Sequence, residues 1–127
     1  MRSVVSLLEE AGARVDRVNG LVNLYKGVPA DGVTGRRYGR PISWSIGMAS
    51  VAGDFDPDWV GEGRGLHLSP TRAGALDHYR RLYPGVVGVL YECVAPLRGC
   101  RPVDEADLLQ FRCHWATATR VVAARVA

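Results

Sequence analysis

Hydrophobic residues recur along this chain with two periods, one typical of helices and one typical of strands. Residues 3–14 have the helical period: Val4, Leu7 and Ala11 fall on one side of a helix, and Gly12 lies near the end of the segment. This spacing predicts a short helix close to the N-terminus, ahead of the main body of the chain.

A second segment, residues 70–83, has the same period. Leu76 and Tyr79 belong to its apolar stripe, and a Pro-Gly pair directly after the segment ends the pattern. Serine is a preferred N-cap residue and proline is favoured in the first helical position. The sequence therefore predicts that Ser69 caps this helix and that Pro70 is its first residue.

Other segments have the composition or the alternation of strands. Residues 86–94 are mostly apolar on both faces, which predicts a central, covered strand. Residues 107–116 alternate, so Leu109 and Phe111 are expected to face the core while Arg112 lies on the opposite face. The predicted strands are 21–28, 64–69, 86–94, 107–116 and 119–126.

Helices and strands of this kind, in a chain of 127 residues, predict a single α+β domain, with a helix in residues 1–20 and a core over 21–126. Residues 29–63 hold seven glycines and three prolines and are expected to form a functional loop. No segment is long and apolar enough for a membrane span, and we expect a cytoplasmic protein. The three cysteines lack metal-site spacing, so we expect free thiols and no metal.

Charge changes this picture at one place. The net charge of +3 permits anionic partners without requiring them. Arg36, Arg37 and Arg40 lie between glycines, and guanidinium groups match the geometry of phosphate oxygens. This segment is predicted either to contact phosphates or to be a solvated basic loop.

Lys26 breaks the pattern of its predicted strand. It falls on the same face as the apolar residues Val22, Leu24 and Val28. A lysine on such a face must extend to solvent, pair with an anion or line a cleft. The sequence leaves an edge position and a cleft position open.

His67, Ser69 and Glu92 are also unusual for their surroundings. His67 and Ser69 share one side of a strand that leads into a predicted helix, where an anionic ligand can be held. The alternative is a structural histidine beside a capping serine. Glu92 lies among apolar residues, so it is expected either to pair with an arginine or to act in a site with a raised pKa.

Four segments occur in an informative order. Leu24–Gly27 has an aromatic residue, a basic residue and a glycine, and Gly65–Ser69 is a glycine-led strand. A helix with Ala75 and Tyr79 follows, and then the strand Val89–Val94. Together they resemble the ADP-ribosyltransferase fold, in its poly(ADP-ribose) polymerase-like branch. Small actinobacterial and phage proteins with a G-L-H-x-S-P-T segment are similar as well.

The resemblance implies two packed, mostly antiparallel sheets with flanking helices, and NAD bound as a substrate in a cleft between the sheets. It implies that Tyr25, Lys26 and Gly27 hold the ribose, at a position where the family has His or Arg. His67 would contact nicotinamide, where a tyrosine is common, with Ser69 in support. The residues that would contact the pyrophosphate or the target are Arg36, Arg37 and Arg40.

Two functions follow from this resemblance. The first is NAD-dependent ADP-ribosyl transfer or NAD cleavage, with His67 and Glu92 as catalytic residues, because the last strand has no glutamate at the expected place. The second is a non-catalytic binding or structural module for a protein or nucleic-acid partner, for instance in a toxin or phage system. Convergence of Lys26, His67 and Glu92 on one cleft favours the first function. Burial of Glu92 against an arginine, together with a cleft filled by Trp44 or Trp59, favours the second.

Overall fold

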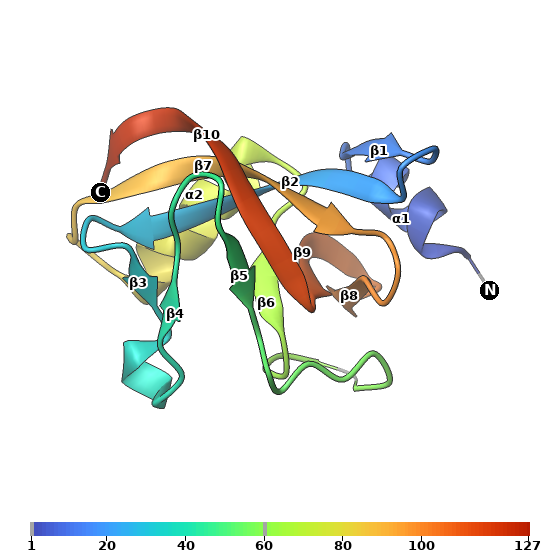
Figure 1. Ribbon diagram of the computed structural model, residues 1–127, viewed down its shortest axis with the longest axis horizontal. Coiled ribbons are helices and arrows are strands. Elements are labelled where there is room, and N and C mark those ends of the chain that lie inside the picture. The colour runs from blue at the N-terminus through green and yellow to red at the C-terminus, as the bar shows by residue number, and fades with distance from the viewer. Residues whose placement is uncertain (1, 60) are drawn as a thin grey trace.

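The longest strand pairing in the molecule joins β2 (Leu21–Pro29) to β7 (Gly88–Pro96). The two strands are antiparallel and stay in register over all nine residues of each. They form the middle of a five-stranded sheet with the order β1-β2-β7-β10-β5. Figure 1 shows the computed structural model, which describes residues 2–59 and 61–127.

A three-stranded sheet with the order β6-β9-β8 and a small β3-β4 pair complete the β structure. The α+β class with mostly antiparallel sheets, which the sequence predicts, is therefore confirmed. The elements in chain order are α1 (Val4–Glu10), β1 (Arg14–Asp16), β2 (Leu21–Pro29), β3 (Val33–Thr34), the 3₁₀ turn η1 (Arg36–Tyr38), β4 (Ile42–Ser43), β5 (Ala49–Val51), β6 (Leu66–Leu68), α2 (Arg72–Leu82), β7 (Gly88–Pro96), β8 (Arg101–Asp104), β9 (Asp107–Cys113) and β10 (Trp115–Val126).

Side chains on the two faces of the five-stranded sheet belong to different clusters. One face is covered by α2, whose Ala75 and Tyr79 pack with Leu90 and Val126. The other face contributes to the larger core, in which Leu24 of β2 and its partners are fully buried. Fully burying an aliphatic side chain stabilises the fold by roughly 1.5–3 kcal/mol, so this larger cluster contributes most. Its further members include Leu7, Leu8, Val22, Val28, Leu68, Cys93, Ala95, Phe111 and Cys113.

Helix α2 begins two residues later than the sequence predicts. Thr71 is the N-cap, and its hydroxyl accepts a hydrogen bond from the Gly74 N–H at 3.1 Å. Ser69 cannot take this role because its own N–H and C=O are bonded to the main chain of Tyr25. The prediction of Ser69 as N-cap and Pro70 as first helical residue is therefore wrong. The Ser69 hydroxyl instead accepts a hydrogen bond from the Gln110 amide.

The prediction for β9 is also partly wrong. Leu109 is 47% exposed, whereas Arg112 is fully buried. The predicted strand 107–116 ends at Cys113, and the chain then enters β10 of the other sheet, which is longer than the predicted 119–126. Where the chain passes from one sheet to the other, the solvent does not lie on the same side of the strand throughout. The alternation of the sequence therefore predicts the wrong residues to be buried at this end of the strand.

Neither helix in the described part of the chain has the length and apolar character that a membrane span needs. The three cysteines are buried free thiols. Within residues 2–59 and 61–127, no group of three His, Cys, Asp or Glu side chains is placed to hold a metal ion.

The contact between α2 and β2 gives a stability prediction. A Cβ added at Gly27 would lie 2.6 Å from the Tyr79 Cβ, a distance that forces the helix or the strand to move. Overpacking of this kind costs about 1–3 kcal/mol, so we expect Gly27→Ala to lower the free energy of unfolding by that amount. Urea denaturation followed by circular dichroism measures it.

Gly53→Ala is the matched control, because Gly53 is exposed and a Cβ there meets no atom within 4 Å. We expect its effect to stay within about 0.5 kcal/mol. Equal stability of the two alanine variants would contradict the close packing of α2 on β2.

Candidate functional site

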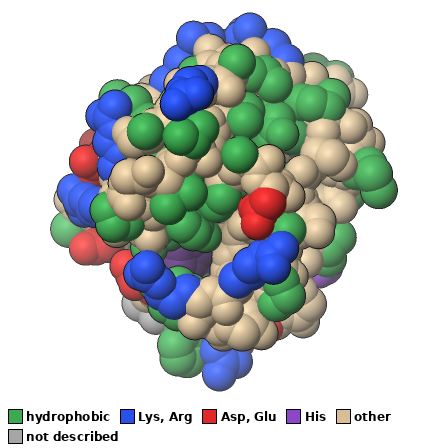
Figure 2. Space-filling view, turned by 90° about the vertical axis from the view of Figure 1, so that its left-hand side faces the viewer, with side chains coloured by type: hydrophobic (Ala, Val, Ile, Leu, Met, Phe, Trp, Pro, Cys, Tyr) green, Lys and Arg blue, Asp and Glu red, His purple; other side chains and the backbone are tan. Residues whose placement is uncertain are grey.

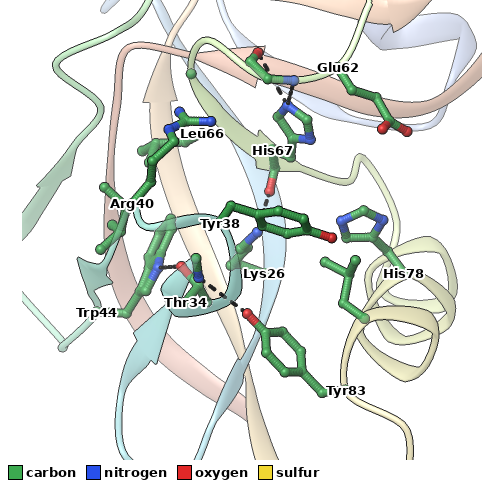
Figure 3. Close-up of a pocket in the computed structure, with 15 residues that line it drawn as sticks. Lys26, Thr34, Tyr38, Arg40, Trp44, Glu62, Leu66, His67, His78 and Tyr83 are labelled. Carbon is green, nitrogen blue, oxygen red and sulfur yellow. Dashed lines mark hydrogen bonds between the residues drawn. The ribbon is translucent and has the colours of Figure 1, made fainter.

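A cavity of about 410 Å³ opens between β2, β6, α2 and the segment that follows β2. Ligand pockets in proteins have volumes of this order and combine apolar walls with a few polar groups. Here the apolar wall comes from Ile42, Leu66 and Leu82. Figure 3 shows the polar and aromatic side chains that point into it. These are Lys26, Thr34, Tyr38, Arg40, Trp44, Glu62, His67, His78 and Tyr83.

Lys26 lies in the wall of this cavity and is 9% exposed. Its Nζ donates a hydrogen bond to the main-chain carbonyl of His67 at 2.8 Å and lies 5.8 Å from the centre of the Trp44 ring. Among the described residues it makes no salt bridge. Burial in this position lowers the Lys26 pKa to about 8, because the charged ammonium loses hydration.

Two histidines share the cavity with Lys26. His67 comes from β6 and His78 from α2, and their ring centres are 6.4 Å apart. Burial is the main cause that lowers the pKa of each to about 4, and the Lys26 charge adds to it. Both imidazoles are therefore neutral at physiological pH. His67 Nε2 lies 3.1 Å from the Gly63 N and 3.5 Å from the Gly63 carbonyl oxygen. The shorter contact, a hydrogen bond donated by the Gly63 N–H, corresponds to the tautomer with its proton on Nδ1, and the longer one to the tautomer with its proton on Nε2.

The basic loop contributes one of its three arginines to the cavity. Arg40 lines the cavity and is paired with Asp54, while Arg36 and Arg37 are exposed outside it. Arg36 lies 3.5 Å from Asp31. Figure 2 shows histidine atoms recessed in a hollow of this face, with basic side chains on its rim. The loop is thus a basic rim beside the cavity.

Aromatic side chains fix the wall formed by the segment after β2. The Trp44 indole N–H donates to the Thr34 hydroxyl at 2.9 Å, and Trp44 is only 4% exposed. The Gly35 N–H donates to the Tyr83 hydroxyl at 3.3 Å, which ties this segment to the end of α2. Tyr38 is 62% exposed and lies at the mouth. Trp44 therefore lines the cavity without filling it.

The remaining predicted site residues lie elsewhere. In the register of β2 and β7, Tyr25 is opposite Glu92, and Lys26 is opposite Tyr91. Neighbouring residues of a strand project to opposite faces, so Tyr25, Gly27 and Glu92 face away from the side that holds Lys26. Ser69 is buried beside Gln110. The structure brings Lys26, His67 and Arg40 together and leaves out Tyr25, Gly27, Ser69, Arg36, Arg37 and Glu92.

Glu92 has the arginine partners that the sequence offered as one alternative. Its carboxylate accepts hydrogen bonds from Arg120 at 2.6 Å and from Arg14 at 2.9 Å, and the Tyr25 hydroxyl donates at 3.4 Å. The bond from Arg120 is the main cause that lowers the Glu92 pKa below its ordinary value. A carboxylate held ionised in this way is a poor proton donor, so the geometry does not support the catalytic role expected for Glu92.

Three residues at or near the cavity were missed by sequence reasoning. His78 lies on α2 one residue before Tyr79, and its helical position beside the apolar stripe was the available signal. Glu62 is exposed in the glycine-rich loop and carried no signal. Arg112 was expected opposite the core side chains of its strand, yet it is buried and donates to the carbonyls of Asp56 and Arg64 at 3.0 Å each, and to that of Trp59.

A smaller cavity of about 200 Å³ adjoins the first one. The two share Glu62, His67 and His78 in their walls. The smaller one also has Asp77, Asp104 and Asp107 in its wall, together with Arg81, which is paired with Asp77. The histidines therefore lie between the cavity of Lys26 and one with more carboxylates.

Comparisons with known proteins found no matching family model, no similar curated protein and no similar solved structure.

The state of Lys26 can be measured directly, because it is the only lysine of the chain. Protein labelled with carbon-13 lysine gives one ε-carbon signal in an NMR titration. We expect its midpoint at about pH 8, far below the value of about 10.4 for a free lysine side chain. A midpoint at the free value would contradict a buried Nζ.

The ion pairs of Glu92 predict a pH-dependent stability. Removing its charge with Glu92→Gln is expected to cost about 1 kcal/mol at pH 7, since hydrogen bonds to charged groups are strong but both arginine side chains are exposed to solvent. The pKa of Glu92 is lower in the folded protein than in the unfolded chain, where it is about 4.3, so the ionised carboxylate stabilises the folded state above that pH. This stabilisation is lost as the pH falls through the pKa of Glu92 in the folded protein. Unfolding curves from pH 7 to pH 2 should therefore converge for the two proteins. A constant difference would contradict the role of the charge.

Proposed function

We propose that the cavity around Lys26 binds NAD and that the chain is an ADP-ribosyltransferase-like enzyme, which cleaves the bond between nicotinamide and ribose. One observation carries the proposal. Lys26 and His67, which the motif resemblance selects from separate segments of the chain, line one cavity and are joined by the bond from Nζ to the His67 carbonyl at 2.8 Å. The periodicity of the sequence does not require Lys26 and His67 to be in contact.

The polar groups of the cavity suit the parts of the dinucleotide. Lys26 donates to a ribose hydroxyl, and the neutral His67 ring offers a flat surface and, in the tautomer with its proton on Nδ1, an N–H to nicotinamide. Arg40 supplies positive charge for the pyrophosphate at the rim, where Tyr38 adds an aromatic face. The volume of about 410 Å³ suits one half of the dinucleotide, with the other half extending along the basic rim.

Cleavage of the glycosidic bond also requires negative charge near the ribose, because positive charge develops on the sugar in the transition state. Glu92 is on the far side of the sheet and is neutralised by two arginines. Glu62 lines the cavity beside His67 and replaces Glu92 in our proposal. The adjoining smaller cavity gives water or a target side chain access to the same reacting carbon.

A second candidate function is a non-catalytic module that binds a nucleotide, or a protein or nucleic-acid partner. The observation that favours it is the ionised Glu92, fixed between Arg14 and Arg120 as a structural ion pair. A fold can keep a binding cavity and lose turnover, since function depends on the site.

Calorimetric titration with NAD, followed by an assay of nicotinamide release on the same sample, separates the two functions. We expect Lys26→Met and His67→Ala to weaken NAD binding about tenfold or more, which corresponds to the loss of about 1.4 kcal/mol of contact. We expect Glu62→Gln to retain binding and to lose release. Glu92→Gln is the matched control, a neutralised carboxylate outside the cavity, and should keep both.

Binding without release by the wild-type protein would favour the non-catalytic module. Absence of binding at millimolar NAD would exclude the NAD-cleaving enzyme and would favour a module with a protein or nucleic-acid partner. Loss of release in Glu92→Gln, with Glu62→Gln unaffected, would reverse the assignment of the carboxylates.

A further inference from the structure

The cavity holds the only lysine of a chain that otherwise uses arginine for all of its basic side chains. Fifteen arginines occur in the sequence, and the single lysine is Lys26. An arginine stays charged at any physiological pH, whereas a lysine amine can lose its proton when it is buried. Only one position in the chain therefore has a basic side chain that can lose its proton on burial, and that position lines the cavity of about 410 Å³.

The surroundings of Nζ favour a free amine. Its hydrogen bond to the His67 carbonyl uses one N–H, and the described residues give it no carboxylate partner. Trp44 and the neutral imidazoles of His67 and His78 do not stabilise an ammonium as a carboxylate does. Burial lowers the Lys26 pKa to about 8, so a sizeable fraction of the amine is neutral at the pH of a cell. Its lone pair is then available to a ligand in the cavity.

We propose that Lys26 is a covalent site, at which Nζ forms a reversible imine with an aldehyde that carries a phosphate or a similar anion. The nitrogen lone pair attacks the carbonyl carbon, and the carbonyl oxygen takes up a proton to give a carbinolamine. The hydroxyl then leaves with a second proton as water, and the carbon–nitrogen double bond forms. The net reaction joins one amine and one aldehyde and releases one water, without an oxidant or a reductant.

Groups for the proton transfers and for the anion are at hand. The neutral imidazoles of His67 and His78 lie in the same wall, and each has one unprotonated ring nitrogen that can accept a proton released by the attacking amine. Arg40 is paired with Asp54, and its remaining guanidinium N–H groups at the cavity are the donors for the anion. This reactivity goes beyond NAD cleavage, because it needs neither a glycosidic bond nor the Glu62 carboxylate.

Pyridoxal 5′-phosphate and pyridoxal are a matched pair of aldehyde probes that differ in the phosphate. Each is incubated with the protein at pH 7.5, reduced with borohydride and mapped by peptide mass spectrometry, with N-acetyl-lysine amide in the same tube as a reference amine. We expect the phosphorylated probe to label Lys26 about tenfold faster than the reference, because a lower pKa raises the neutral fraction of the amine. Pyridoxal should react more slowly, and Arg40→Gln should remove the difference between the probes.

Lys26→Arg keeps the positive charge and cannot form an imine, so it should lose both the adduct and the imine absorbance. Absence of an adduct at Lys26 in the wild-type protein, or labelling no faster than the reference amine, would overturn the proposal even if that variant failed to fold. Equal labelling by both probes would overturn the anion preference. Calorimetry with NAD contains no aldehyde, so failure of imine formation and failure of NAD binding are separate results.

Discussion

Two main-chain hydrogen bonds between Tyr25 and Ser69 determine the geometry of the candidate site. The Tyr25 N–H donates to the Ser69 carbonyl at 2.7 Å, and the Ser69 N–H donates to the Tyr25 carbonyl at 2.9 Å. They join the free edge of β2 to the end of β6, which belongs to the other sheet. This junction puts Lys26 within reach of the His67 carbonyl. Because α2 follows β6 in the chain, the junction also places α2 against the face of β2 that lies opposite to the Lys26 side chain.

Because side chains alternate along β2, one face of the strand packs against α2 and the other face contributes Lys26 to the cavity. Tyr25 and Gly27 face the side that α2 covers, where Gly27 leaves room for Tyr79. Lys26, between them, faces the side of the large core and the cavity. Packing on the other face thus explains the glycine next to Lys26, and a ligand is not needed to account for it. The motif that resembles a binding signature also satisfies a folding constraint.

Much of the fold could be predicted from the sequence, because local patterns determine it. The strands β2 and β7 are long and apolar, and their periodicity places both Lys26 and Glu92 among apolar residues. The cap of α2 and the end of β9 could not be predicted, since they depend on which strand pairs with Ser69 and where the chain changes sheets. The helical period gave a signal for His78 beside the apolar stripe of α2, whereas Glu62 joins the site only through tertiary contacts of its loop. The family assignment remains a prediction.

The buried Arg112 connects these unpredicted contacts to the site. Its guanidinium donates to carbonyl groups of Asp56, Trp59 and Arg64, so main-chain dipoles stabilise a charge that lacks a carboxylate partner. Burial lowers its pKa, but an arginine remains protonated. Because these carbonyls flank Glu62 in the chain, the same bonds hold the loop that carries the exposed carboxylate at the cavity. A loop with many glycines loses much entropy on ordering, and a buried cation with several acceptors offsets that cost. The position of Glu62 therefore depends on a residue of β9 that touches neither cavity.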